Sequence, residues 1–353
     1  MNNRSSNPIP TKESRWQRLK IGLLFTLVAV IIFGGGIVLG RKLPRRSRLR
    51  LQQIREGQFV PDKYIFINPL LSCEVAGRKE VVELAPLKSQ LLEFIDAKVR
   101  AGDVMRVSIY FDTRDGRWLG VNTNEKYFPA SLMKVPTMIA LLKVAEEHPD
   151  ILTKKITYHG DFDLNSLEYF KPEKTLRVGV PYTVEELIER MIVYSDNNAL
   201  PLLLTAIDNK ELQEVYTDLG IVIPPEVSDS LVDYMTVKSY ASFFRVLYNA
   251  TYLSRAMSEK ALKLLGQSSF KEGLVAGLPS YITVAKKFGE RNFSSPPNDR
   301  TSQKELHDCG VVYFPSHPYL LCIMTKGKDF ERLAKTIKEI SRMVYEFQNR
   351  QFK

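Results

Sequence analysis

One stretch of this sequence constrains the fold of the chain more than any other feature. Residues 21–40, IGLLFTLVAVIIFGGGIVLG, form a run of 20 residues without a charge. At about 1.5 Å per residue, a helix of this length matches the roughly 30 Å hydrocarbon core of a bilayer. A cleaved signal peptide has a shorter apolar region, about 7 to 15 residues, and a small-residue cleavage site, which is missing here. We therefore predict one uncleaved transmembrane helix over 21–40.

The positive charge of the chain is concentrated around this run. Residues 1–60 contain 12 Lys/Arg and 2 Asp/Glu, which accounts for the whole formal charge of +10, and the other 293 residues contain 38 of each. A neutral body with a basic N-terminal segment favours a membrane-proximal role over nucleic-acid binding. We predict a basic tail over 1–20 and a basic juxtamembrane linker over 41–75, which could bind anionic polymers or headgroups or simply be solvated.

Two details of the anchor stay open. Basic residues are almost equally frequent before and after the run, so charge does not decide its orientation. Gly36 and Gly40 form a G-x-x-x-G pair, which could support dimerisation through the helix or only reflect the tolerance of membrane helices for glycine.

Cysteines and histidines give no metal-binding pattern. The three cysteines contain no C-x-x-C pair, and no H-E-x-x-H motif is present. The cysteines are Cys73, Cys309 and Cys322, and the histidines are His148, His159, His307 and His317. We expect no metal site and buried free thiols, with one disulfide as the alternative if the domain is exported.

Residues 76–353 are predicted to fold as one α+β domain. Apolar residues recur at helical spacing over 87–99 and again from 330 to 347, at the two ends of this region. A mainly helical stretch of about 131–265 separates two groups of strand-like segments. These segments are 104–112, 116–122, 280–289, 308–314 and 319–325. Terminal helices on an antiparallel sheet, with a helical lobe inserted between the strands, make an α+β domain.

The first candidate motif for catalysis is Pro129-Ala130-Ser131-Leu132-Met133-Lys134 at the start of a strong helix. Lys134 lies one turn after Ser131 and on the same helix face, within reach of the hydroxyl. A neutral lysine there can take the serine proton, provided that burial and nearby positive charge lower its pKa. The motif alone is weak, because S-x-x-K recurs by chance, as at Ser268 and Lys271, and Ser131 could be only a helix N-cap.

Two further motifs follow along the chain. Ser195-Asp196-Asn197 comes after a helix that Thr183 and Glu186 would cap as a capping box. By itself, such a polar turn is typical of a cap or loop. Lys287-Phe288-Gly289 lies in an apolar strand pattern, where a lysine on an edge strand is the ordinary alternative.

The three motifs together resemble those of the serine β-lactamases and penicillin-recognising enzymes, and most closely the class A β-lactamase-like domain. S-D-N follows S-x-x-K by 64 residues, and K-x-G follows after a further 92. WLGVNTNEKYFPASLMKVP and GLPSYITVAKKFG are also similar to the family's sequences at these sites. The resemblance covers roughly 84–347 and implies the same α+β architecture, an antiparallel sheet flanked by terminal helices with an inserted all-helical lobe.

The resemblance also implies roles for individual residues. Ser131 would be the acylated nucleophile and Lys134 the base that activates it. Ser195 would pass a proton to the leaving nitrogen, and Asn197 would bind the substrate amide. Lys287 would supply positive potential for Ser195 and for a substrate carboxylate.

Backbone groups would complete the implied site. The oxyanion hole would consist of the amides of Ser131 and Glu290, and Glu290 follows Gly289 on the strand. Asp196 would hold its loop rather than react. The resemblance implies neither a cofactor nor a metal.

Two departures from the family pattern concern turnover. Phe288 stands where the family usually has a hydroxyl residue that binds the β-lactam carboxylate. In class A enzymes a glutamate in an E-x-x-L-N loop, some 36 residues after the S-D-N serine, activates the deacylating water. That motif is absent here, and Glu226, Asp229 and Asp233 are equivalent candidates to replace it. Acylation is therefore better supported than deacylation.

These observations predict a membrane-anchored, extracytoplasmic serine hydrolase that forms an acyl-serine intermediate with an amide or β-lactam. The expected partner is a β-lactam or a peptidoglycan-like peptide, and the expected location is the cell membrane, with a single pass. Two alternatives remain. One is a penicillin-binding, peptidase-like protein that deacylates slowly, and the other is a non-catalytic protein of the same fold that binds wall peptide.

Overall fold

The computed structural model describes residues 64–68, 82–113, 116–224, 232–293 and 303–352. The predicted tail, the predicted transmembrane helix of 21–40 and most of the predicted linker lie outside these ranges. Among the helices that are described, none has the length and apolar character needed to span a membrane.

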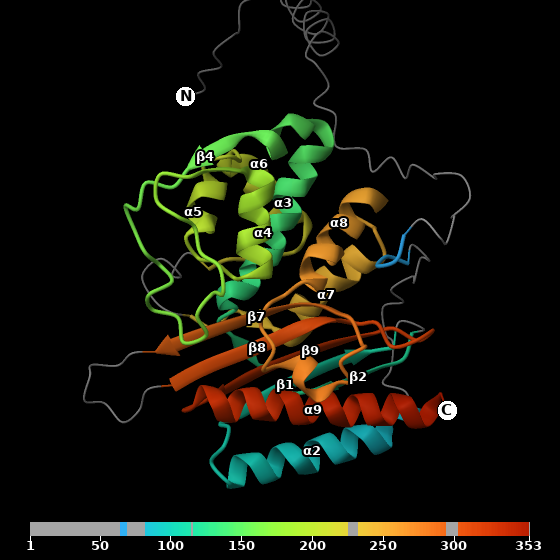
Figure 1. Ribbon diagram of the computed structural model, residues 1–353. Helices are drawn as coiled ribbons and strands as arrows, with labels where there is room; N and C mark the ends of the chain where they lie inside the picture. The colour runs from blue at the N-terminus through green and yellow to red at the C-terminus, as the bar shows by residue number, and fades with distance from the viewer. Residues whose placement is uncertain (1–63, 69–81, 114–115, 225–231, 294–302, 353) are drawn as a thin grey trace, which may run out of the picture. The chain divides into compact units, whose positions relative to one another are not determined.

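A five-stranded antiparallel sheet forms the base of the domain (Figure 1). Its spatial order is β2-β1-β9-β8-β7, so β7 is the last strand on one side. The strands are β1 Arg106–Asp112, β2 Trp118–Val121, β7 Val284–Phe293, β8 Gln303–Val312 and β9 Tyr319–Gly327. Both predicted hairpins, β1–β2 and β8–β9, are confirmed by their pairing.

Two helices from opposite ends of the domain cover one face of the sheet (Figure 1). They are α2, Ala85–Arg100, and α9, Phe330–Gln351, which begins at the N-cap Asp329. Their apolar stripes are buried against the sheet. The buried residues include Leu87, Leu91 and Ile95 of α2 and Leu333, Ile337, Ile340 and Val344 of α9. The prediction of terminal helices packed on a sheet is therefore confirmed.

The other face carries most of the helices inserted between β2 and β7, with a second buried core (Figure 1). The helical segments on this face are η3 Ala130–Met133, α3 Lys134–Glu147, η4 Pro149–Thr153, α4 Val184–Val193, α5 Ala199–Leu204, α6 Asn209–Asp218, α7 Val237–Tyr248 and α8 Arg255–Gly266. The last inserted segment, η6 Leu274–Gly277, instead packs on α9, where Ser341 Oγ donates a 2.8 Å hydrogen bond to Leu274 O. The predicted capping box of Thr183 and Glu186 is present at the start of α4.

The lobe is not purely helical, which corrects the prediction of an all-helical insertion. Two short ladders occur, one between β4, Lys155–Thr157, and β5, Pro181–Thr183, and one between β3, Lys126–Tyr127, and β6, Met235–Thr236. Strands of two or three residues are too short to produce a period-2 pattern in the sequence, which is why they were not predicted.

Part of the predicted linker packs on the domain. The backbone N–H groups of Ile65, Phe66 and Ile67 donate hydrogen bonds of 2.8 to 3.1 Å to the carboxylate of Glu259 on α8. The ring of Phe66 also makes an edge contact with Tyr313. Residues 64–68 are therefore bound to α8 rather than free in solvent.

The expectation of free thiols is wrong for two of the three cysteines. Cys309 of β8 and Cys322 of β9 form a disulfide, and the two residues are direct partners in the strand register. Their sequence separation gave no sign of this pairing, because it depends on the register of the β8–β9 hairpin. Cys73 lies outside the described residues.

Candidate active site

The nucleophile candidate Ser131 lies on η3, immediately before α3 begins at Lys134. Ala130, the residue before it, has a φ of 49°. Positive φ is strained for a residue with a Cβ, and such strain concentrates at functional sites. The residue after Ser131 is also fixed, because Tyr240 of α7 donates a 3.0 Å hydrogen bond to the backbone carbonyl of Leu132. The surrounding structure thus holds the serine in a sharp, defined turn.

Gly289 of β7 brings the strand against this turn. A Cβ at Gly289 would lie 2.8 Å from Pro129 O, closer than real Cβ atoms come to other atoms, and 3.0 Å from Leu132 N. The absence of a side chain therefore lets β7 pass directly beside η3. This places the backbone of Glu290, the next residue, beside the segment that carries Ser131.

Lys134 is buried and contacts the S-D-N loop. Its Nζ donates to Ser195 O at 2.7 Å, to Asn197 Oδ1 at 2.5 Å and to Ser195 Oγ at 3.3 Å. No hydrogen bond joins Lys134 to Ser131 Oγ within the described residues. Burial lowers the pKa of Lys134 to about 8, although the carboxylates of Glu168, Asp196 and Glu290 act to raise it.

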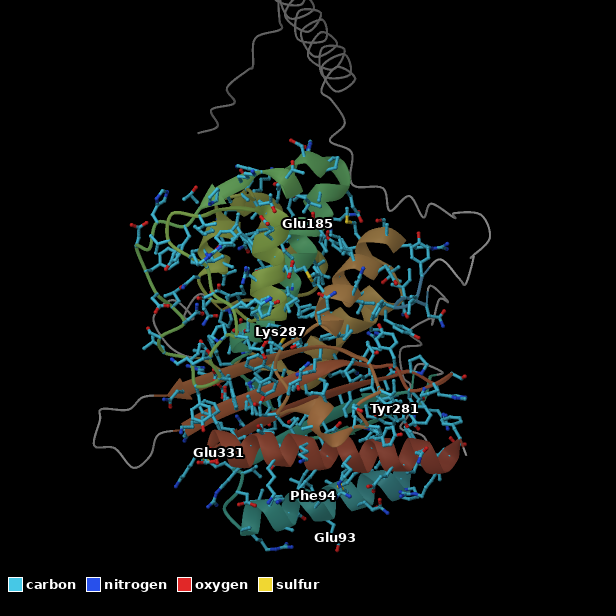
Figure 2. All side chains as sticks on the ribbon, in the orientation of Figure 1. Glu93, Phe94, Glu185, Tyr281, Lys287 and Glu331 are labelled. Carbon is cyan, nitrogen blue, oxygen red and sulfur yellow. A yellow bond between two sulfur atoms is a disulfide. The ribbon has the colours of Figure 1, made fainter. Side chains whose placement is uncertain are left out.

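Lys287 of β7 also contacts Ser195, at the place where the sheet meets the helical lobe (Figure 2). Its Nζ donates to Ser195 Oγ at 2.8 Å and to Phe288 O at 2.9 Å. Burial, together with the positive charges of Lys134 and Lys286, lowers the pKa of Lys287 well below its usual range. We call Lys134, Ser195, Asn197 and Lys287 the lysine–serine cluster.

The S-D-N loop that presents Ser195 and Asn197 is fixed from inside. Ser195 has a φ of 59°, and Asp196 behind it is fully buried. The Asp196 carboxylate accepts hydrogen bonds from Asn165 Nδ2 at 2.7 Å and from Leu176 N at 2.8 Å. As predicted, Asp196 holds the loop.

Glu168 belongs to the site but was not predicted. Its Oε1 accepts a 2.5 Å hydrogen bond from Asn197 Nδ2, the group expected to bind a substrate amide. It also contacts the carboxyl group of Glu290 on β7. Glu168 lies in a long polar loop before α4, where no periodic pattern or motif marks a residue as functional.

Phe288, the residue that departs from the family's third motif, packs into an aromatic cluster. Its ring stacks on Phe270 at 4.0 Å between centroids and contacts Phe170 edge-on at 6.2 Å. Only 5% of Phe288 is exposed. Its side chain therefore supports β7 from the α9 side and offers no group to a substrate carboxylate.

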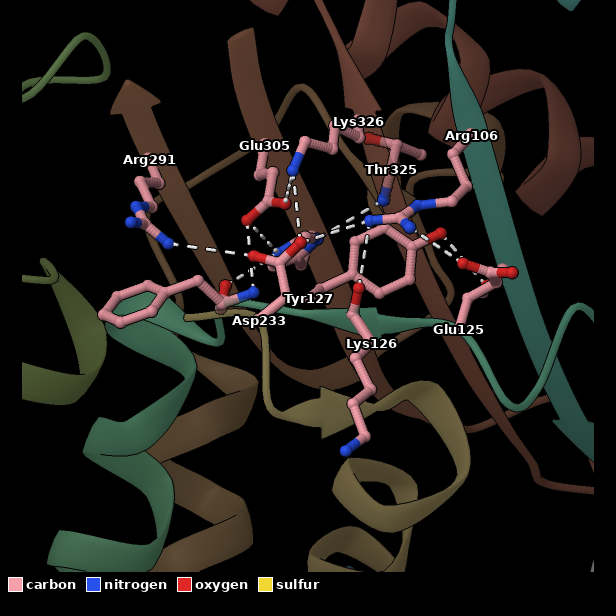
Figure 3. A network of polar contacts seen from close by, with 12 residues as sticks. Arg106, Glu125, Lys126, Tyr127, Asp233, Arg291, Glu305, Thr325 and Lys326 are labelled. Carbon is pink, nitrogen blue, oxygen red and sulfur yellow. Dashed lines mark hydrogen bonds and ion pairs between the residues drawn. The ribbon is translucent and has the colours of Figure 1, made fainter. Parts of the chain in front are cut away.

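A second charged cluster holds the chain just before Ser131 (Figure 3). Phe128 N donates to Glu305 Oε2 at 3.2 Å, and Phe128 O lies 3.1 Å from His307 Nε2, with both partners on β8. Burial lowers the pKa of His307 to about 4, so the imidazole is neutral at pH 7. Burial and the charge of Asp233 raise the pKa of Glu305 to about 7.

The charges around Glu305 are paired with one another (Figure 3). Asp233 lies 3.3 Å from Arg106, 3.1 Å from Lys326 and 3.9 Å from Arg291. Glu305 Oε1 lies 3.2 Å from Lys326 Nζ. We call this the ion-pair network; its members are Arg106, Glu125, Asp233, Arg291, Glu305 and Lys326. Glu226 and Asp229, the other candidates for the missing glutamate, lie outside the described residues.

The structure thus brings together the predicted residues Lys134, Ser195, Asn197 and Lys287, and places Gly289 against the turn that carries Ser131. The second S-x-x-K copy is different, because Lys271 Nζ donates to the backbone carbonyl of its own Ser268. Within the described ranges, no three His, Cys, Asp or Glu side chains are arranged to hold a metal ion.

Comparison with known proteins agrees with this architecture. A curated β-lactamase of Bacillus licheniformis is 23% identical over 296 residues, covering 78% of this chain and 88% of the relative. Among solved structures, the penicillin G acyl-enzyme complex of a PBP-A mutant matches with a TM-score of 0.62 at 21% identity, over 78% of this chain and all of that one. A class A β-lactamase from Mycobacterium abscessus matches with a TM-score of 0.59 at 20% identity, over 74% of this chain and 98% of that one.

The structural likenesses show the shared α+β fold, and a family model extends the relationship to the sequence. The model of the beta-lactamase enzyme family matches residues 86–348, which is most of the chain and includes all three motifs. The resemblance seen in the sequence is therefore confirmed: this chain belongs to the beta-lactamase enzyme family and is a serine hydrolase.

Proposed function

We propose that this serine hydrolase is anchored in the membrane by residues 21–40, faces the extracytoplasmic side, and acts through an acyl intermediate on Ser131 with an amide or β-lactam. The observation that carries the proposal is the position of Ser195 Oγ. It lies 3.3 Å from Lys134 Nζ and 2.8 Å from Lys287 Nζ. A hydroxyl between two buried lysines can both accept and donate a proton, which is what relay to a leaving group requires.

Acylation would proceed by proton transfer and attack. Neutral Lys134 takes the proton of Ser131, and Ser131 Oγ forms a bond with the substrate carbonyl carbon. The N–H groups of Ser131 and Glu290 stabilise the oxyanion. As the carbon–nitrogen bond breaks, the nitrogen takes the hydroxyl proton of Ser195, and the Lys134 ammonium replaces that proton. Lys287, which donates to Ser195 Oγ, keeps this hydroxyl oriented.

Two observations support the anchor and its orientation. The uncharged run of 21–40 has the length of a membrane span. The Cys309–Cys322 disulfide is typical of proteins in oxidising compartments outside the cytoplasm. Treating intact cells with an external protease tests both points: loss of the domain is expected, and full protection of the domain would contradict export.

A second candidate is a penicillin-binding, peptidase-like protein with slow deacylation. The observation that favours it is the state of Asp233, which was a candidate to activate the deacylating water. Its carboxylate is held by Arg106 and Lys326 in the ion-pair network. A carboxylate whose oxygens are bound by two cations is not free to orient a water for attack.

Time-resolved intact-mass spectrometry with penicillin G distinguishes these functions, with wild-type chain and Ser131→Ala measured in parallel. A lasting adduct on the wild type alone indicates a penicillin-binding protein with slow deacylation. A transient adduct with accumulating hydrolysed drug indicates a β-lactamase. If neither protein gains mass, penicillin is not an acyl donor, and binding of wall peptide without turnover becomes the better explanation. Equal adducts on both proteins would exclude Ser131 as the nucleophile.

A further inference from the structure

Two carboxyl groups meet at the outer strand of the sheet, beside Asn197. Glu290 follows Gly289 on β7 and is 7% exposed, and its Oε1 accepts a 3.0 Å hydrogen bond from Phe170 N. Glu168 reaches the same place from the loop before α4. It accepts the hydrogen bond of Asn197 Nδ2 and contacts the carboxyl of Glu290. The pair is thus one hydrogen bond away from the lysine–serine cluster.

The two carboxyl groups hold one proton between them and therefore carry one negative charge that no ion pair in the described part of the chain compensates. Two carboxylates in contact repel each other, so the Glu290 carboxyl keeps a proton, which it shares with Glu168 in the hydrogen bond between them. Burial and the contact with Glu168 raise the pKa of Glu290 to about 9. Apart from this shared proton, the buried Oε2 of Glu290 has no hydrogen-bond donor among the described residues. A buried acceptor without a fixed donor is costly, and a ligand that donates to it removes that cost.

The surrounding contacts keep the pair in place. Tyr169 donates a 3.1 Å hydrogen bond to Glu331 of α9, and the ring of Phe170 packs edge-on against Phe270 at 4.9 Å. The two residues that follow Glu168 are therefore fixed on the α9 side of β7. A site that is preformed in this way binds a ligand without first ordering the loop.

We infer that Glu168 and Glu290 form a recognition site for a primary ammonium group of the substrate, adjacent to the amide that Asn197 binds. The inference rests on the proposed function, since it assigns a substrate class to the same site. An ammonium supplies up to three N–H donors, enough for Glu290 Oε2 and for Glu168. On binding, the shared proton leaves to solvent and the ammonium takes its place, so the net charge of the site stays at minus one.

Charge elsewhere in the cluster is consistent with this selectivity. Lys134 and Lys287 lie on the serine side of Asn197, where they suit an oxyanion or a leaving group. The carboxyl pair lies on the other side of that amide. A substrate with an ammonium next to its reactive amide meets a carboxylate there, whereas a substrate with a carboxylate at that position meets like charge.

Three penicillins test the inference by acylation. Their phenylacetyl side chains differ only at the α-carbon, which carries an ammonium in ampicillin, hydrogen in penicillin G and a carboxylate in carbenicillin. At pH 6.5 we expect the second-order acylation rate to be about tenfold higher for ampicillin than for penicillin G, and lowest for carbenicillin, since a charge-assisted hydrogen bond is worth about that factor. Glu168→Gln should bring the ampicillin to penicillin G ratio to within about twofold of one.

The matched control is Glu173→Gln, which removes the same charge from an exposed position of the same loop. It should keep the wild-type ratio. If Glu168→Gln slows all three penicillins equally, the pair only anchors the loop and the inference is wrong. A wild-type ratio near one would overturn it as well.

A binding measurement keeps the inference testable even if Ser131 is not acylated. Calorimetry with the Ser131→Ala chain, at pH 7 in two buffers of different ionisation enthalpy, counts protons released on binding. We expect release of about one proton with ampicillin and none with penicillin G, because only the ammonium displaces the shared proton. Adding Glu168→Gln should abolish the release. Binding of ampicillin without proton release, or failure of ampicillin to bind more tightly than penicillin G, would refute the ammonium site.

Discussion

Two charged clusters flank the segment that carries Ser131, and they differ in the partners of their basic side chains. In the lysine–serine cluster, Lys134 and Lys287 donate to a hydroxyl, to carbonyl oxygens and to an amide oxygen. In the ion-pair network, Arg106 and Lys326 each face a carboxylate (Figure 3). Neutral partners do not compensate a buried ammonium, so its pKa falls and it can exchange protons. Carboxylate partners hold the charge, which suits fixing a backbone.

Adjacent residues of β7 repeat this contrast. Lys286 and Lys287 are both buried, but their side chains lie on opposite faces of the strand. Lys286 forms a 3.0 Å ion pair with the buried carboxylate of Asp308, whereas Lys287 contacts Ser195 Oγ at 2.8 Å. The partner therefore decides whether a buried lysine stabilises the fold or remains available for chemistry.

The largest expected effect comes from Lys134→Met. Removing the base should lower the acylation rate about a thousandfold, within the usual range for general-base catalysis. The free energy of unfolding should not fall, because methionine fills the space without burying an amine. Acylation by penicillin G and urea unfolding measure the two quantities.

Lys286→Met is the matched control. It should leave the charge of Asp308 buried and uncompensated, and lower the free energy of unfolding by about 3 kcal/mol. A Lys134→Met variant that acylates at the wild-type rate would contradict the distinction between the two clusters.

The pH dependence of acylation should give the next largest effect. Lys134 acts when neutral, and its pKa is lowered to about 8. The acylation rate should therefore rise about tenfold per pH unit from pH 6 and level off near pH 8. Because Lys134 and Lys287 share Ser195 Oγ, the midpoint belongs to the pair of lysines. A flat profile between pH 6 and 9 would exclude a lysine base.

Gly289→Ala tests the close approach of β7 to the nucleophile turn. The new Cβ would meet two backbone atoms, Pro129 O and Leu132 N, which cannot move without shifting Ser131. A misplacement on the order of 1 Å lowers rates by up to about a hundredfold, and we expect a loss between about tenfold and that limit in acylation. At Gly266, in contrast, a Cβ meets only side-chain atoms, the nearest in the ring of Phe66, so Gly266→Ala should acylate normally.

Local patterns in the sequence predicted much of the fold and of the lysine–serine cluster. The terminal helices follow from apolar spacing, and the box of Thr183 and Glu186 follows from residues three apart. The boundary of β7 was less accurate: its predicted range of 280–289 became Val284–Phe293, because the polar outer end is a strand only through backbone pairing with β8. A strand end that is stabilised mainly by backbone pairing with its neighbour shows no strand pattern in its own sequence.

Contacts between distant segments could not be predicted in this way. Glu168 contacts Glu290, which lies 122 positions later in the sequence. Asp233 forms ion pairs with basic residues of three strands, β1, β7 and β9. The Cys309–Cys322 disulfide likewise depends on strand register. Motifs located the serine and the lysines because their spacing is repeated within the family, whereas the groups that tune their charge are brought together only by the fold.

The smallest predicted effect belongs to the ion-pair network. Asp233→Asn removes the carboxylate that Arg106 and Lys326 share, and should lower the free energy of unfolding by about 1.5 kcal/mol, the value of a charged hydrogen bond. Phe128 remains bound by Glu305 and His307, so the acylation rate should fall less than about threefold. Urea unfolding and acylation kinetics measure both. A large loss of the acylation rate without a loss of stability would place Asp233 in the reaction, and would remove the distinction between a cluster that reacts and a network that holds it in place.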